Sequence, residues 1–179
     1  LNDILEPLTE IILRNKGTVD KYLGDGIMAF WNAPLESKCH AELALKTAFD
    51  MLLCVQKKRN ELSGSDEYQI ADLSKLSIGI GVNTGIATVG NIGSKHRFDY
   101  SVIGDAVNLT ARLEGQCKNY KVDNVISEYT LHALKLAGLG DIIDPDIKFL
   151  PLDCVKVVGK NISVRIYTLV SNKGSEADM

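Results

Sequence analysis

The sequence has little of what would direct it to a disulfide framework, a zinc site or a nucleic acid. Its four cysteines lie far apart and form no Cys-x-x-Cys pair, so we expect reduced thiols and a cytoplasmic location. The 20 basic and 23 acidic side chains leave a net charge of −3, which argues against a broad basic surface for nucleic acid. No apolar run approaches the roughly 18 residues of a membrane helix, so we expect this domain not to contact a membrane.

The sequence does contain enough apolar residues for one core. With 45% hydrophobic residues among 179, we expect a single domain over residues 1–170 and a disordered tail over 171–179. Apolar spacing and turn residues predict that the chain opens inside or at the start of a helix that ends before Gly17, with further helices over 38–62, 106–117 and 128–136. Strands are predicted over 18–22, 27–31, 76–83, 86–91, 124–127, 152–158 and 163–169. This mixture indicates an α/β fold of the α+β type, in which helices cover a sheet of mixed direction.

Two hairpins are predicted among these strands. An Asp-Gly between two β-prone runs is a strong hairpin signal, so the turn at 24–26 should place Asp25 at a tight tip. The second hairpin is predicted around Thr84 and Gly85. By itself, Asp25 could serve only to make its turn.

Two segments stand out from this background. Residues 20–26 read Asp-Lys-Tyr-Leu-Gly-Asp-Gly, and residues 98–114 read Phe-Asp-Tyr-Ser-Val-Ile-Gly-Asp-Ala-Val-Asn-Leu-Thr-Ala-Arg-Leu-Glu. In this order they resemble the two signature stretches of the class III adenylyl and guanylyl cyclase catalytic domain. The resemblance covers residues 1 to about 170, and it implies a ferredoxin-like βαβ-βαβ core with an extra hairpin.

The resemblance also implies a reaction and its catalytic groups. The ribose 3′-hydroxyl of ATP attacks the α-phosphate, which gives 3′,5′-cyclic AMP and pyrophosphate, with two Mg²⁺ or Mn²⁺ ions per site. Asp25 matches a metal-binding aspartate of the family, Asn108 its ribose-positioning asparagine, and Arg112 the arginine that stabilises the transition state. Asn108 and Arg112 are four residues apart and share one helix face. A surface ion pair with Glu114 or another acid is the alternative role for Arg112.

Lys21 and Ser101 match the two positions that select the base. A lysine only donates hydrogen bonds, which suits the N1 acceptor of adenine, and a serine oxygen can accept from the exocyclic amine. Guanylyl cyclases typically carry Glu and Cys at these positions, so this pair favours ATP. Because a serine can also donate, we expect its discrimination to be soft. Lys21 could instead be an ordinary exposed lysine on a strand.

The chain departs from the family pattern in two places. A Lys-Gly-Lys that supplies the triphosphate-binding lysine reads Val158-Gly159-Lys160 here, which leaves Lys160, or else Lys156, for that role. The family's first strand, with a second metal aspartate in Phe-x-Asp-[Ile/Val]-x-Gly-Phe, would precede residue 1, and neither Asp3 nor Asp20 lies in that context. We therefore expect a domain lacking its first strand, inactive by itself.

Family sites form between two protomers, and this one chain carries residues from both halves. A homodimer with two shared sites is the simplest expectation. The alternatives are a guanylyl cyclase and a non-catalytic cyclase-like module that binds nucleotide or dimerises. In each case the domain could belong to a larger, membrane-attached signalling protein.

Overall fold

The computed structural model describes residues 1–63, 76–138, 147–156 and 163–171. Within these ranges the elements, in chain order, are α1 (Asn2–Arg14), β1 (Thr18–Leu23), β2 (Gly26–Phe30), α2 (His40–Ser63), β3 (Ile80–Val82), β4 (Thr88–Ser94), β5 (Arg97–Ile103), α3 (Asp105–Tyr120), β6 (Asn124–Ser127), α4 (Glu128–Leu136), β7 (Ile147–Lys156) and β8 (Ser163–Ser171). None of the described helices is both long and apolar enough to cross a membrane.

The central sheet has the strand order β3-β6-β8-β7. β3 and β6 are parallel and are joined through α3, whereas β8 is antiparallel to both β6 and β7. β6 and β7 therefore run in the same direction, with α4 between them in the chain and β8 between them in the sheet. The predicted class, an α+β fold with a mixed sheet covered by helices, is confirmed.

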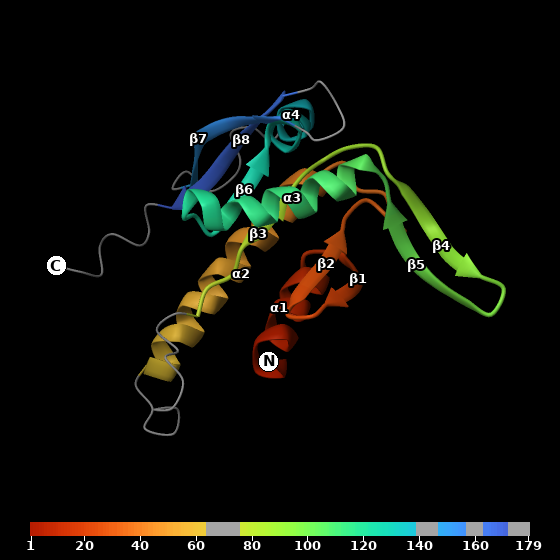
Figure 1. Ribbon diagram of the computed structural model, residues 1–179, viewed down its shortest axis with the longest axis horizontal. Coiled ribbons are helices and arrows are strands. Elements are labelled where there is room, and N and C mark those ends of the chain that lie inside the picture. Colours follow the sequence, from red (N-terminus) through yellow and green to blue (C-terminus); the bar gives the residue numbers. More distant parts are fainter. Residues whose placement is uncertain (64–75, 139–146, 157–162, 172–179) are drawn as a thin grey trace.

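Helices cover both faces of this sheet. Neighbouring side chains of β6 point to opposite faces, so each shows which helices pack on its side. Ile126 packs in a buried cluster with Leu45 of α2 and Leu134 of α4. Val125 packs in a second cluster with Leu113 of α3. Both β6 side chains are fully buried, so α2 and α4 lie on one face and α3 lies on the other (Figure 1).

Two hairpins lie outside the central sheet. β1 pairs with β2, and β4 pairs with β5 in a long hairpin that projects away from the body of the protein (Figure 1). The rings of Phe30 on β2 and Tyr100 on β5 lie 6.1 Å apart, and this contact joins the two hairpins. α3 begins directly after β5, so the projecting hairpin and the helix are continuous in the chain.

The predicted hairpin at Thr84 and Gly85 is wrong. β3 pairs with β6 rather than with β4, and β4 turns back through residues 95 and 96 to pair with β5. Asn83 donates a hydrogen bond from Nδ2 to the carbonyl oxygen of Ala106 at 2.9 Å, which ties the end of β3 to the start of α3. The segment after β3 is therefore bound to α3 and does not form a hairpin turn.

The end of β8 falls on the first residue of the predicted tail. Ser171 is the last residue of β8 and pairs with Ile147 of β7, and residues 172–179 lie outside the described ranges. β7 begins at Ile147, earlier than the predicted strand over 152–158, whose last two residues lie outside those ranges.

Candidate active site

The tip of the first hairpin carries Asp25, as the sequence predicts. Leu23 pairs with Gly26, so the loop between them has only two residues. Gly24 is the first of these and has φ +67°, a conformation that glycine adopts without steric cost. Asp25 is exposed, and it has no salt bridge to another described residue. Its carboxylate oxygens are therefore accessible to a cation.

Asn108 and Arg112 both lie on the exposed side of α3. Leu109 and Leu113, each one position further along, are buried against the sheet and fix the rotation of the helix. Residues four apart on a helix share a face, so Asn108 and Arg112 are presented side by side, as predicted. The structure thus provides an amide and a guanidinium on one surface.

Lys21 and Ser101 come together from separate hairpins. Lys21 lies on β1 and Ser101 on β5, and Lys21 Nζ donates a hydrogen bond to Ser101 Oγ at 3.3 Å. The Lys21 side chain remains 46% exposed, while Ser101 is buried. A flexible donor that reaches the surface therefore stands next to a hydroxyl held just beneath it.

Asp20 is a third member of this group, which the sequence pattern does not predict. Its side chain is completely buried, its Oδ2 accepts a hydrogen bond from Ser101 Oγ at 2.8 Å, and its Oδ1 lies 3.4 Å from Lys21 Nζ. Neighbouring residues in a regular strand point to opposite sides, so the sequence pattern places Asp20 away from Lys21. The only signal in the sequence is an acidic residue beside a basic one.

Two predicted features are not gathered into this site. Lys160 lies outside the described residues, as does the Val158-Gly159 that precedes it. Within the described ranges no group of three or more His, Cys, Asp or Glu side chains is placed to hold a metal ion. Asp25 therefore does not belong to such a group in the described ranges.

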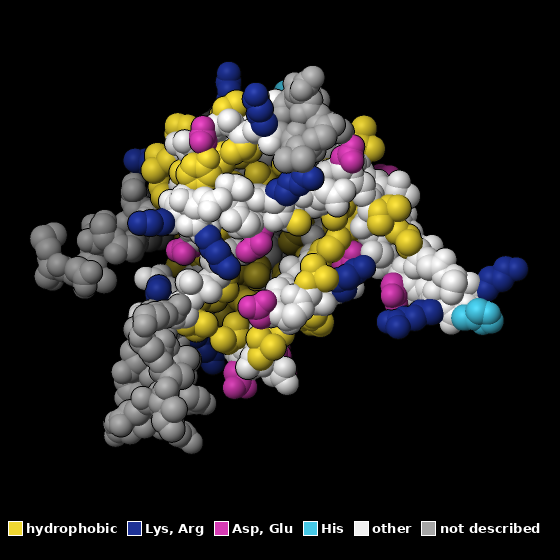
Figure 2. All heavy atoms as spheres, viewed as in Figure 1, with side chains coloured by type: hydrophobic (Ala, Val, Ile, Leu, Met, Phe, Trp, Pro, Cys, Tyr) yellow, Lys and Arg dark blue, Asp and Glu magenta, His cyan; other side chains and the backbone are white. Residues whose placement is uncertain are grey.

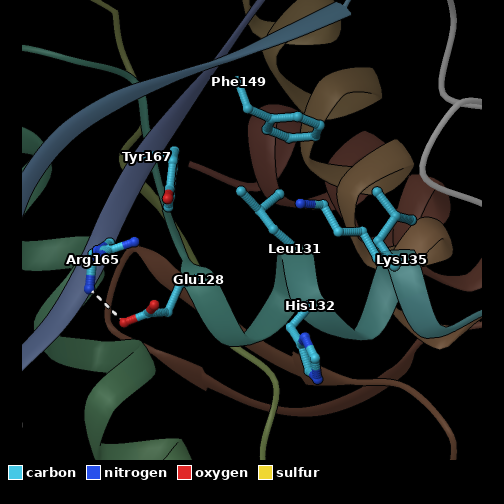
Figure 3. A pocket seen from close by; sticks show the side chains of 8 residues that line it. Glu128, Leu131, His132, Lys135, Phe149, Arg165 and Tyr167 are labelled. Atoms are coloured by element: carbon cyan, nitrogen blue, oxygen red, sulfur yellow. Dashed lines mark hydrogen bonds between the residues drawn. The ribbon is translucent and has the colours of Figure 1, made fainter.

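A hollow of about 430 Å³ lies elsewhere on the molecule, between α4 and the strands β7 and β8 (Figure 3). Phe149, Leu131 and Tyr167 form its apolar wall, and Glu128 accepts a hydrogen bond from the backbone N–H of Arg165 at 2.8 Å. None of the predicted site residues within the described ranges lines this hollow. The Lys21–Ser101 pair instead lies at the surface where the two hairpins meet.

Comparisons with known proteins identify the family of the chain. The family model described as the adenylate and guanylate cyclase catalytic domain matches residues 1–171. Adenylate cyclase 1 of Rhizobium meliloti is 30% identical over 170 residues, which are 95% of this chain and 23% of that protein. The adenylate cyclase of Anabaena cylindrica is 33% identical over 170 residues, 93% of this chain and 31% of that protein. The chain thus spans less than a third of the length of these relatives.

Solved structures of the same kind superpose on the chain. The adenylyl cyclase CyaB from P. aeruginosa has a TM-score of 0.77 and 30% identity, with 99% of this chain and 82% of that chain covered. The guanylyl cyclase Cya2 has a TM-score of 0.74 and 30% identity, with 100% and 82% covered. The family match over nearly the whole chain, together with this shared fold, shows that the chain belongs to the family of adenylate and guanylate cyclase catalytic domains.

Proposed function

We propose that this domain is the catalytic domain of an adenylyl cyclase, which converts ATP to 3′,5′-cyclic AMP and pyrophosphate. Overall similarity does not choose between ATP and GTP, because the adenylyl cyclase CyaB and the guanylyl cyclase Cya2 are both 30% identical to this chain. The choice has to come from the residues that contact the base. The names of the two curated relatives described above, both adenylate cyclases, support ATP.

The contact between Lys21 and Ser101 is the observation that carries the proposal. The Watson–Crick edge of adenine offers an acceptor at N1 beside a donor at the exocyclic amine. Lys21 Nζ is a donor, and it stands 3.3 Å from a serine oxygen that can accept. The adjacent donor and acceptor match the adenine edge, whereas guanine presents the opposite pattern, a donor at N1 and an acceptor at O6.

α3 supplies the groups for the ribose and the reacting phosphate. Asn108 positions the ribose by hydrogen bonds, so that its 3′-hydroxyl faces the α-phosphate. Arg112 presents a planar guanidinium to the phosphoryl oxygens, on which negative charge builds during the attack. The buried leucines beneath them hold both side chains on one rigid surface. Lys160 is proposed to bind the triphosphate.

Asp25 is the proposed metal ligand, for Mg²⁺ or Mn²⁺ with two ions per site. Its exposed carboxylate at a tight turn fits such an ion, because Mg²⁺ is commonly held by one or two carboxylates with substrate phosphates completing its shell. A divalent ion, when bound, makes the ribose hydroxyl more acidic and screens the charge of the triphosphate.

The active form is proposed to be a homodimer with two shared sites. Asp25, Lys21 and Arg112 are all exposed, and none of them lines the hollow between α4, β7 and β8 or the one that α1 forms with Lys58. Both hairpins also carry exposed apolar side chains, with Tyr22 51% and Phe98 62% exposed, and Figure 2 shows hydrophobic atoms at the surface over these hairpins. A second copy would cover this apolar surface and complete the sites.

The test is to measure turnover of ATP and GTP side by side, with Mg²⁺ and with Mn²⁺, on the full-length protein. We expect kcat/KM for ATP to exceed that for GTP, and the double variant Lys21→Glu with Ser101→Cys to lower this ratio by about tenfold or more. Equal turnover of the two nucleotides would refute the assignment of the base. A preference for GTP would favour a guanylyl cyclase, and binding without turnover would favour a non-catalytic module.

A further inference from the structure

β1 contains an irregularity at the residue before Lys21. The register of β1 against β2 pairs Val19 with Ala29 and Lys21 with Met28, which leaves Asp20 without a partner in β2. Such a β-bulge changes the direction in which side chains point, and bulges are frequent beside active sites. It explains how two successive residues, Asp20 and Lys21, both reach Ser101 on β5.

The bulge buries the Asp20 carboxylate under the base-reading pair. Its Oδ2 accepts two hydrogen bonds, from Ser101 Oγ at 2.8 Å and from the backbone N–H of Val102 at 3.3 Å. Its Oδ1 is buried and makes no hydrogen bond to a described residue, although Lys21 Nζ lies 3.4 Å away as an ion-pair partner. Asp20 is thus held in place by the backbone of β5 and faces both residues that are proposed to read the base.

The chemistry of these partners fixes the orientation of the Ser101 hydroxyl. A serine hydroxyl has one hydrogen to donate and two lone pairs. A lysine ammonium cannot accept a hydrogen bond, so the hydroxyl hydrogen has to point to Asp20. What remains available to a ligand is a lone pair, and Ser101 can then only accept.

We propose that Asp20 is a specificity-determining positioning residue that holds Ser101 as a hydrogen-bond acceptor for the exocyclic amine of adenine. This inference rests on the proposed function and deepens it. A freely rotating serine could donate to O6 of guanine as readily as it accepts from the amine of adenine. Because its hydrogen is donated to Asp20, Ser101 presents a lone pair to O6 of guanine, which is itself an acceptor. Guanine is therefore disfavoured at Ser101 as well as at Lys21, where two donors would meet.

The test compares two substitutions of similar size at Asp20. In Asp20→Asn, the Val102 N–H and the Ser101 hydroxyl both donate to the Oδ2 position, so the asparagine places its amide oxygen there. Ser101 then stays an acceptor for the ligand. Asp20→Leu fills the same space with no acceptor, so Ser101 is free to donate. We expect the ratio of kcat/KM for ATP over GTP to fall about tenfold in Asp20→Leu and to stay within about threefold in Asp20→Asn.

Asp99→Leu is the matched control, because Asp99 is an exposed acid on the same strand, two residues before Ser101, and should leave the ratio unchanged. A merely structural role of Asp20 would lower kcat/KM for both nucleotides and keep their ratio. An unchanged ratio in Asp20→Leu would therefore overturn the proposal. An equal loss in Asp20→Asn would also overturn it, since the charge next to Lys21 would then be the cause.

If Asp20→Leu shows no cooperative thermal unfolding, the ATP-over-GTP ratio of kcat/KM is measured in Ser101→Ala instead. Removal of the hydroxyl should lower the ratio by about tenfold, and adding Asp20→Asn to it should change the ratio no further, because no hydroxyl is left to orient. A ratio that stays at the unmodified value would refute the inference. An unmodified protein that shows no preference for ATP would instead refute the proposed function, so the two failures are distinguishable.

Discussion

The central sheet and the two hairpins distribute their side chains in opposite ways. In the sheet, Val125, Ile126 and Ile166 are fully buried between helices on both faces. The hairpins carry the acidic and basic site residues, and they also carry exposed apolar side chains such as Phe98. The apolar side chains of the sheet are therefore buried within one chain, while the hairpins leave apolar side chains exposed to solvent.

This difference separates the part of the chain that determines stability from the part that determines chemistry. α3 belongs to both, because its inner face packs on the sheet through Leu113 and Cys117 and its outer face presents Arg112. Substitutions of exposed residues in the hairpins and on the outer face of α3 should change activity at nearly constant stability. Substitutions beneath α3 should change stability first.

The largest effect is expected at the exposed groups. In the full-length protein, Asp25→Ala should abolish turnover for want of a metal ligand, and Arg112→Ala should lower kcat by about 100-fold or more. Because both side chains are exposed, the melting temperature of each variant should stay close to that of the unmodified protein. A cyclic AMP assay and a thermal melt on the same samples check this.

Mixing the two inactive variants then tests whether the sites are shared. A dimer of one Asp25→Ala chain with one Arg112→Ala chain has one complete site and one that lacks both groups. After random exchange of equal amounts, about half the dimers are mixed, so activity should reach roughly one quarter of the unmodified level. If mass measurement shows that mixed dimers form while activity stays at the level of the separate variants, the sites are not shared in this way.

The second effect is a loss of stability in the sheet. Ile126→Ala removes a fully buried side chain from between α2, α4 and β6, and it should lower the free energy of unfolding by about 2–5 kcal/mol. Leu136→Ala is the control, since Leu136 is 75% exposed at the end of α4, and it should cost less than about 0.5 kcal/mol. Urea unfolding measures both, and equal losses would contradict the assignment of the core.

A smaller effect is expected where the sheet touches α3. A Cβ at Gly81 would lie 2.5 Å from the carbonyl oxygen of Thr110 and 2.6 Å from the backbone nitrogen of Glu114, so Gly81→Ala has to push α3 away from β3. We expect a loss of about 1–3 kcal/mol and reduced activity, because Asn108 and Arg112 move with the helix. Gly115→Ala on the same helix meets no atom within 4 Å and should instead stabilise by up to about 1 kcal/mol.

The same division explains what the sequence predicts well. β6 over Asn124–Ser127 and α4 over Glu128–Leu136 match the predicted ranges, because an apolar strand is followed by a serine whose side chain accepts a hydrogen bond from the N–H of Thr130 and caps the helix. These signals are local. The placement of Asp25 at a hairpin tip and of Asn108 and Arg112 on one helix face follows in the same way, from a tight turn and a four-residue helical spacing.

The features that the sequence does not predict depend on distant partners. β5 has exposed charged and aromatic residues over most of its length, and it becomes a strand because it pairs with β4. Asp20 contacts Ser101 only because of a bulge, and its partner is 81 residues away in the chain. No periodicity of either segment indicates these contacts.

The smallest effect concerns the buried side of α3 and appears only at high pH. Burial raises the pKa of the Cys117 thiol from its ordinary value of 9.0 to about 11, with Glu114 and Asp123 nearby adding to the shift. The unfolded chain therefore loses this proton first, so the contribution to stability is complete below pH 9 and is lost as the pH rises toward 11.

Other groups titrate in the same range, so the measurement is a difference between proteins. The free energy of unfolding of the unmodified protein, measured in urea, should fall more steeply between pH 9 and 11 than that of Cys117→Ala. Cys154→Ala is the control, because Cys154 is exposed on β7 and should leave the slope unchanged. Equal slopes for the unmodified protein and Cys117→Ala would show that this thiol reaches solvent in the folded state, and that the inner face of α3 is less closed than its contacts with the sheet indicate.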